Sequence, residues 1–218
     1  MVEFIGGRFM KIIDISMPIH HDMPVYKGKE EKRPHLKVQS DFTTGSAYET
    51  LLTMNMHTGS HLDRSLHMIE GGTKVESLDL EKVITKCKVL DLTEVNEKIT
   101  AQDLEKKDIQ EGDFILLKTR NSFEDILEGD FVFLEKTGAA YLRDKKIKGV
   151  GTDALGIERA QPAHETHITL LETDSVIIEG LRLKEVEEGE YFLFAAPLYI
   201  VGAEAAPLRA VLIQDFED

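Results

Sequence analysis

The chain contains short runs in which apolar and polar residues alternate, the pattern of β-strands that turn one face toward a core. Several runs are rich in Val, Ile, Leu and Phe and end near Gly, Pro or Asp, which favours strands over helices. The runs predicted to form strands are residues 11–17, 48–56, 88–93, 114–119, 131–134, 148–153, 176–180 and 191–198. Because they recur along most of the chain, the sequence predicts an extensive sheet.

Three segments between these runs have helical features. They are residues 77–86 with Ser77 as N-cap, residues 100–106 with Thr100, and residues 137–146 with Thr137. Leu80 and Val83 share one helical face in the first segment, and Asp103 lies three residues after the cap in the second. Helical segments alternate with strands, and no repeat or linker-like tract divides the chain. The pattern therefore predicts a single α/β domain with a mixed sheet.

Histidine is concentrated in one stretch, MNMHTGSHLDRSLHMIEGG. Three of the eight histidines, His57, His61 and His67, lie there together with Asp63. Imidazole nitrogen and carboxylate oxygen are ligands that suit Zn²⁺ or Mn²⁺, and a site with two histidines and one aspartate leaves a coordination position open for water. The alternative is a group of surface or hydrogen-bonded histidines. The close spacing beside a Gly-Ser turn favours a catalytic metal site.

The local pattern indicates how these side chains could converge. The run at residues 48–56 is followed by a Gly-Ser pair, so its strand is expected to end in a tight turn at His57. If residues 61–63 are extended, His61 and Asp63 point the same way while Leu62 turns to the core. The turn would then bring His57 toward the other two ligands.

Composition excludes several classes of partner. The chain has 218 residues with 40 acidic and 26 basic side chains, a formal net charge of −14, and no cluster of Lys and Arg, so neither nucleic acid nor an anionic membrane is expected to bind. No apolar run approaches the ~20 residues of a membrane span, and the first residues do not form a signal peptide. The single cysteine, Cys87, lies in an alternating run and is expected to be a buried thiol. These features indicate a cytoplasmic protein.

Four segments resemble a known family. HTGSHLDRSLH is similar to the H-x-G-T-H-x-D-x-P-x-H signature of the metal-dependent cyclase family, whose best-known members are bacterial kynurenine formamidases. Residues 14–28, 149–158 and 167–213 resemble the family's opening segment, its G-x-D-x-x-S-x-D loop and its closing segment. The resemblance implies the swivelling β/β/α fold of the cyclase family for residues 10–218. Residues 1–9 would be an extension, with Met10 as an alternative start.

The resemblance also implies a metal site. Its five ligands would be His57, His61, Asp63, His167 and Glu179, with Asp63 bridging two ions. One or two Zn²⁺ ions per chain are expected, and Mn²⁺ is the alternative. Glu179 is also indicated by its own setting, because a carboxylate that ends an apolar strand needs a compensating cation or hydrogen bonds.

Further residues complete the expected active site. The resemblance implies that His67 acts as a general base and then as a general acid; the alternative is a fourth metal ligand. Tyr26 is expected to contact substrate, and its alternative is a tyrosine packed within a loop. Lys27, Arg64 and Ser65 depart from the family pattern. They are expected to border the pocket, where Lys27 and Arg64 would favour an acidic substrate.

The reaction implied by the resemblance is hydrolysis of a non-peptide C–N bond. The leading substrate is a small-molecule amide of the N-formyl aryl amine type, N-formyl-L-kynurenine, which would place the enzyme in tryptophan catabolism. The alternatives are a cyclic amide such as isatin, a lactone, or a metal-binding protein without catalysis. A homodimer or homotetramer is also expected, with the alternating apolar segment 167–213 as an interface. Without the resemblance, His164 and His167 would be interpreted as surface histidines.

Overall fold

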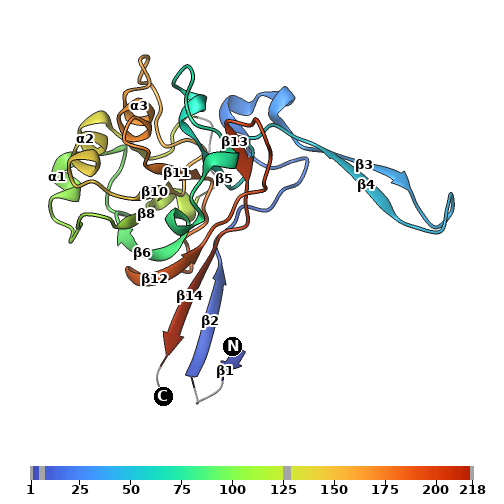
Figure 1. Cartoon of the computed structure of the whole chain (residues 1–218), viewed down its shortest axis with the longest axis horizontal. Coiled ribbons are helices and arrows are strands. Elements are labelled where there is room, and N and C mark those ends of the chain that lie inside the picture. The colour runs from blue at the N-terminus through green and yellow to red at the C-terminus, as the bar shows by residue number, and fades with distance from the viewer. Residues whose placement is uncertain (1, 5–7, 125–128, 217–218) are drawn as a thin grey trace.

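The main feature of the computed structural model is a ten-stranded mixed sheet (Figure 1). The structure describes residues 2–4, 8–124 and 129–216. In spatial order the strands are β1 (Val2–Phe4), β2 (Arg8–Asp14), β14 (Val211–Phe216), β12 (Gly189–Phe194), β6 (Ile84–Asp91), β8 (Phe114–Lys118), β10 (Gly149–Thr152), β11 (Val176–Glu179), β5 (His61–Asp63) and β13 (Ala205–Pro207). The central strands β6, β8, β10 and β11 run parallel to one another, and the other pairs are antiparallel. The predicted mixed sheet is therefore confirmed.

Two apolar cores lie on opposite faces of this sheet. In β8, Phe114 and Leu116 belong to one core, and Ile115 and Leu117 belong to the other. The helices α1 (Ala101–Leu104), α2 (Lys136–Asp144) and α3 (Glu165–Leu171) contribute buried side chains to the second core. Figure 1 shows these three helices grouped together beside the sheet. Because both faces of β8 and β11 are covered, their sequences FILLK and VIIE are nearly continuous apolar runs, whereas β6 contains Thr85, Lys86 and Lys88.

Two of the three predicted helices are present. In α1, the Asp103 carboxylate accepts the backbone N–H of Thr100 at 2.9 Å, as the predicted capping box requires. In α2, the N-cap is Glu135 rather than Thr137. The Glu135 carboxylate accepts the backbone N–H of Thr137 at 2.8 Å, so a longer acidic side chain takes the capping role two residues earlier.

The predicted helix at residues 77–86 is wrong. The segment contains two short 3₁₀-helices, Val75–Ser77 and Leu80–Lys82, and then enters β6. Ile84 and Thr85 are β-branched and pair with β12. Their strand preference and their sheet partner override the helical spacing of the preceding residues.

Each of the eight predicted strands coincides in part with an observed strand. The run at 131–134 shrinks to β9 (Phe133–Leu134), which pairs with the short strand β7 (Lys98–Ile99) in a separate two-stranded sheet. The strands β3, β13 and β14 and the helix α3 were not predicted. Other short 3₁₀-helices span Tyr26–Gly28, Glu30–Lys32, Ser65–His67 and Arg120–Ser122.

The hairpin of β3 (His35–Ser40) and β4 (Glu49–Thr53), here called the arm, projects from the body of the molecule (Figure 1). Among the described residues, its two strands pair only with each other. Leu36 lies opposite Leu52 across the arm, and the two residues are 56% and 45% exposed. Val38 is exposed as well. The alternation at residues 48–56 thus predicted a strand correctly but not the solvent exposure of its apolar side chains.

The N-terminal residues form one edge of the sheet. β1 pairs antiparallel with β2, and β2 begins at Arg8, before Met10. The boundary expected at Met10 therefore falls inside a strand, and the dispensability of residues 1–9 stays a prediction. Within the described part of the chain, no helix has both the length and the apolar character needed to cross a membrane.

Candidate metal centre

Two neighbouring strands, β5 and β11, carry the middle of the candidate site. They are antiparallel, and His61 lies directly opposite Glu179. Asp63 shares the face of His61, because residues two apart in a strand point the same way, whereas Leu62 enters the apolar core on the other face. His61, Asp63 and Glu179 are 1%, 0% and 5% exposed. The extended conformation predicted for residues 61–63 is confirmed, and it buries three ionisable side chains together.

The turn before β5 is fixed against the end of β11. The Ser60 hydroxyl donates to the Gly180 carbonyl at 2.7 Å and accepts the Met17 backbone N–H at 2.7 Å. Gly180 has a φ of 73°, and a Cβ at this position would collide with the Gly59 carbonyl oxygen. Only glycine combines this backbone conformation with so close an approach. The turn that carries His57 is therefore held at a defined distance from β11.

Helix α3 supplies a further side chain. It follows His164, whose backbone is left-handed with a φ of 52°. His167 is buried, and its Nε2 lies 3.3 Å from Glu179 Oε1 and 3.8 Å from Asp63 Oδ2. The His164 side chain is 56% exposed. The interpretation of both as surface histidines, made without the resemblance, is wrong for His167, because α3 turns this residue toward the sheet.

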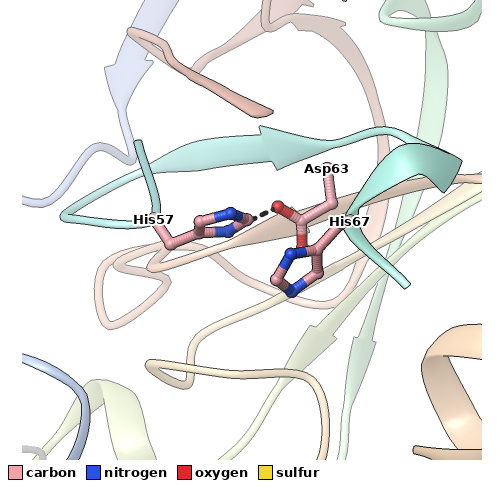
Figure 2. A group of neighbouring side chains, drawn as sticks. All are labelled: His57, Asp63 and His67. Carbon is pink, nitrogen blue, oxygen red and sulfur yellow. Dashed lines mark ion pairs between the residues drawn. The ribbon is translucent and has the colours of Figure 1, made fainter. Parts of the chain in front are cut away.

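His57 and His67 face Asp63 from the turn and from the segment after β5 (Figure 2). His57 Nδ1 lies 3.0 Å from Asp63 Oδ1, and His61 Nε2 lies 3.6 Å from the same oxygen. Asp63 therefore presents Oδ1 to two histidines and Oδ2 to His167. This is the geometry of a carboxylate that can bridge two cation positions.

Three buried atoms of this cluster have no hydrogen-bond partner among the described residues. They are His61 Nε2 and both carboxylate oxygens of Asp63. Buried polar atoms are normally hydrogen-bonded, because leaving them unpaired forfeits their solvation. Nitrogen and carboxylate oxygen donors directed into one space match the ligand preferences of Zn²⁺ and Mn²⁺. The residues present therefore fit a transition-metal site.

Each of three histidine rings uses its second nitrogen outside the cluster. The His61 Nδ1 lies 2.8 Å from the Gly59 carbonyl oxygen. The His167 Nδ1 lies 2.6 Å from Glu158 Oε1, and the His57 Nε2 lies 3.1 Å from Glu204 Oε1. A protonated ring nitrogen at these positions donates to each acceptor. In the neutral ring the other nitrogen carries no proton and is directed at the cluster, which is the tautomer that a metal ligand requires.

The buried carboxylates of the cluster favour the protonated forms of two histidines beside them. Burial opposes the charged form of His61, but Asp63 and Glu179 outweigh it and raise the pKa of His61 to about 9. Burial is likewise outweighed at His167, where Glu158 and Glu179 raise the pKa to about 10. Both histidines thus hold protons in the absence of other cations, and metal binding would release those protons.

His67 ends the 3₁₀-helix Ser65–His67 and lies beside two of the other histidines. Its ring centroid is 4.0 Å from that of His57 and 5.5 Å from that of His167. Burial lowers its pKa to about 4, and the neighbouring histidines add to this effect. His57, Asp63 and His67 are also close enough to share one cation. The geometry therefore admits both the proton-transfer role and the role of a fourth ligand.

A cavity of about 150 Å³ opens onto the cluster. Its walls include Tyr26, Lys32, His57, His67, His167 and Glu179. Burial, together with Glu179 and Glu158, raises the pKa of the half-buried Tyr26, which keeps its hydroxyl protonated. Pockets for drug-sized ligands typically measure ~300–1,000 Å³, so this cavity can enclose only part of an aryl amide.

Two of the residues expected to border the pocket are directed elsewhere. Arg64 is buried and donates to Asp174 Oδ1 at 2.9 Å. The Ser65 hydroxyl accepts the Thr73 backbone N–H at 2.7 Å. The expectation that Arg64 and Ser65 shape the pocket is therefore wrong, because both side chains are used to anchor the segment that follows β5. Lys27 is exposed, and its Nζ lies 5.1 Å from the Tyr26 ring centroid.

Sequence reasoning missed three residues near the site. Glu158 is the last residue of the family-like segment 149–158. An acidic residue at the end of that segment could have been recognised as a candidate site residue. Glu204 lies within the family-like segment 167–213 but at no spacing that singles it out, and Lys32 lies outside the family-like segments. Their places near the site follow only from the way distant loops fold around β5.

Comparisons with known proteins agree with this geometry. The family model described as Putative cyclase matches residues 13–159, more than half of the chain. A kynurenine formamidase of Bacillus anthracis is 30% identical over 93% of this chain and 97% of its own length. A solved structure of a potential metal-dependent hydrolase with cyclase activity is 50% identical, with a TM-score of 0.88 over 96% of this chain and all of the other. Isatin hydrolase A from Labrenzia aggregata is 21% identical and shares the fold, with a TM-score of 0.81 over 94% of this chain and 93% of the other.

Proposed function

We propose a function from one premise: the chain belongs to the cyclase family. The resemblance carried by the four sequence segments is thereby confirmed. On this premise the protein is a metal-dependent hydrolase of non-peptide C–N bonds. The observation that carries the proposal is the buried cluster around Asp63, whose unpaired donor atoms converge on one space.

The proposed cofactor is zinc, one or two ions per chain, with manganese as the alternative. His57, His61 and Asp63 would hold one ion, and Asp63, His167 and Glu179 would hold the other. Such an ion supplies Lewis acidity toward an amide carbonyl and activates water at neutral pH. The imidazole and carboxylate donors support a transition metal over Mg²⁺ or Ca²⁺, which prefer an all-oxygen shell.

The chain's own residues would perform the proton transfers. Hydrolysis adds the hydroxyl of water to the acyl carbon, breaks the C–N bond and gives a proton to the departing amine. We assign both proton movements to His67, which lines the cavity beside His57 and His167. Tyr26 would contact the organic part of the substrate. Tyr26→Ala should then raise KM more than it lowers kcat in steady-state assays.

The leading substrate is an N-formyl aryl amine such as N-formyl-L-kynurenine. The similarity to a kynurenine formamidase over nearly the full length of both chains supports this choice. A cyclic amide or a lactone is the alternative, and the common fold with isatin hydrolase A makes it worth testing. A metal-binding protein without catalysis is less well supported, because His67 is present beside the cluster.

Two measurements test the proposal. Elemental analysis after expression in metal-supplemented medium should find one to two transition-metal ions per chain. A protein that contains no metal and binds none when metal is added would contradict the proposed metal site. The metal-loaded protein should then be assayed with N-formyl-L-kynurenine, formanilide, isatin, a cyclic imide and a lactone. Hydrolysis of the formamides is expected. Activity on the cyclic compounds alone would move the protein to the alternative substrate class and leave the metal-dependent hydrolase intact.

We also propose a cytoplasmic homodimer or homotetramer. The arm supports assembly, because an isolated two-stranded hairpin is marginally stable in water and this one exposes Leu36, Val38 and Leu52. A second copy of the chain is the proposed cover. The single cysteine, Cys87, is buried and free, which suits a reducing compartment. Light scattering at micromolar concentration tests the assembly, and a clean monomer would remove it.

A further inference from the structure

Lys32 is a half-buried cation in the wall of the catalytic cavity. Its Nζ lies 5.4 Å from the Tyr26 ring centroid. Its neighbours in the sequence have acidic partners: Arg33 pairs with Glu30 at 2.9 Å, and Lys29 lies 4.0 Å from Glu31. In the described part of the chain, no carboxylate lies within ion-pair distance of the Lys32 ammonium.

The backbone holds Lys32 at a fixed position relative to the metal centre. Lys32 ends the 3₁₀-helix Glu30–Lys32, and its carbonyl oxygen accepts the Thr58 hydroxyl at 3.0 Å. Thr58 directly follows His57 in the turn before β5. The next residue, Arg33, donates to the Met23 carbonyl at 2.9 Å. Lys32 is thereby tied to the turn that carries a proposed metal ligand, rather than to a free surface loop.

This placement has a cost that the fold itself does not offset. Burial lowers the pKa of Lys32, the nearby Lys29 and Lys27 lower it further, and Glu179 is the main acidic group opposing them. Glu179 is a proposed metal ligand, so its charge would be shared with the metal. Contact with the Tyr26 ring offsets only part of the cost, since an exposed cation–π contact contributes about 0.5–1 kcal/mol. An anion entering the cavity would supply the missing partner.

The surrounding charge supports the same reading. The chain as a whole has a formal net charge of −14 and repels anions. Lys27 and Lys32 nevertheless place two ammonium groups beside Tyr26, with their Nζ atoms 5.1 Å and 5.4 Å from its ring centroid. Tyr26 and Lys32 line the same cavity as His57, His167 and Glu179, so an aryl amide whose reacting group is at the metal centre lies within reach of the Lys32 ammonium. The Lys32 ammonium can donate a charge-assisted hydrogen bond to a carboxylate oxygen of such a substrate.

We infer that Lys32 is a specificity-determining residue that binds a carboxylate carried by the substrate, so that the preferred substrates are amides bearing an acidic group. The inference rests on the proposed function of the same cavity. It assigns the acidic-substrate preference to Lys32, whereas the sequence had pointed to Lys27 and Arg64. The Arg64 side chain is bound to Asp174 instead.

A pair of probes of nearly identical shape tests this inference. The probes are 2-aminobenzoate, which is anionic, and 2-aminobenzamide, which is uncharged. Their dissociation constants are measured by calorimetry on the metal-loaded protein and on the variants Lys32→Met, Lys32→Arg and Lys29→Met. Lys29→Met is the matched control, because it removes the same charge from an exposed neighbour that lies outside the cavity wall.

The expected result is a selective loss. Lys32→Met should weaken 2-aminobenzoate about tenfold, the scale of a charge-assisted hydrogen bond, and leave 2-aminobenzamide within about twofold. Lys32→Arg should retain most of the affinity for the anion, and Lys29→Met should change neither probe. Equal weakening of both probes would show a structural role and overturn the inference. An unchanged affinity for 2-aminobenzoate, or no binding of it by the unaltered protein, would overturn it as well.

Kinetics separates this inference from the proposed function. Hydrolysis of formanilide, which has no carboxylate, tests the reaction alone and provides the reference KM for each protein. N-formyl-2-aminobenzoate should show a KM raised about tenfold in Lys32→Met. Loss of all hydrolysis with the binding selectivity intact would remove the reaction and keep the anion site. If the unaltered protein and Lys32→Met hydrolyse both compounds and Lys32→Met changes neither KM, the reaction stands and the anion site is removed.

Discussion

The arm and β5 lie next to each other in the sequence and invert the usual rule of burial in opposite ways. The arm exposes Leu36 and Leu52, whereas β5 buries His61 and Asp63. Both consist of extended strands in antiparallel pairing: β5 pairs with β11 and β13, and the two strands of the arm pair with each other. Strand geometry therefore does not explain the difference in burial. What differs is the partner that we propose for each: a second copy of the chain for the arm and a cation for β5. Local polarity alone therefore misleads at the two places where the proposed partners bind.

The largest effect is expected from the buried strand. His61→Ala should remove a proposed metal ligand and lower metal affinity by more than the ~10–100-fold typical of outer-shell changes. His67→Ala should spare the metal and abolish hydrolysis, if proton transfer is its role. Metal content by elemental analysis and activity on formanilide are the measurements. Equal loss of metal in both variants would make His67 a ligand.

A second test compares the two outer carboxylates. Glu158 is 4% exposed and accepts from His167, while the Glu204 side chain is 37% exposed and lies beside His57. Glu158→Gln should weaken metal binding about 10–100-fold by removing the charge behind the imidazole. Glu204→Gln should have a smaller effect, because solvent screens an exposed charge. Metal titrations against a competing chelator measure both, and an equal loss would contradict the importance of burial.

The arm gives a test in which assembly is expected to change and metal content is not. Leu36→Thr with Leu52→Thr keeps strand propensity and removes the apolar pair. We expect the assembly to dissociate at about tenfold higher protein concentration, with metal content unchanged. Lys37→Gln, on the other face of the arm, is the control. Concentration-dependent light scattering measures the shift. If the double variant assembles as before, a second copy does not cover this face.

The smallest effect is expected at the edge of the sheet. A chain that begins at Met10 loses β1 and the first two residues of β2. Because these strands lie at the opposite end of the sheet from β5, metal content should not change. Stability should fall by about 1 kcal/mol, which lowers Tm by about 2–4 °C in a protein of this size. Failure of the shortened chain to fold would show that residues 1–9 are an integral part of the sheet.

Much of this architecture is readable from local pattern, and the exceptions have physical causes. Runs such as 114–119 are apolar enough to require burial in any fold, so their strands were predicted. The 77–86 segment failed because its second half pairs with β12, a partner more than a hundred residues away. His61 and Asp63 were found because their spacing of two matches one face of a strand. His167 was found only through the resemblance, since its burial depends on how α3 packs.

Lys32, Glu158 and Glu204 show a different limit. Each reaches the site from a separate segment of the chain. None is related to the other site residues by the residue spacing of one helix face or one strand face. Arg64 shows the converse, because its position next to Asp63 suggested the pocket while its side chain pairs with Asp174. Closeness in the sequence therefore predicts which side chains of β5 share a face, but it does not predict which residues of other segments contact them.

The contact between Ser60 and Gly180 determines how late in folding the proposed metal site can form and bind a cation. These residues are 120 positions apart, and their hydrogen bond joins the turn of His57 to the end of β11. A site built across so long a loop cannot form until most of the sheet has been assembled, since the entropy of closing the loop is spent first. A cation that binds only after that step stabilises the native state and not the transition state. Metal should therefore slow unfolding and leave the refolding rate nearly unchanged, so that the bound ion sets the lifetime of the native fold rather than the speed of reaching it.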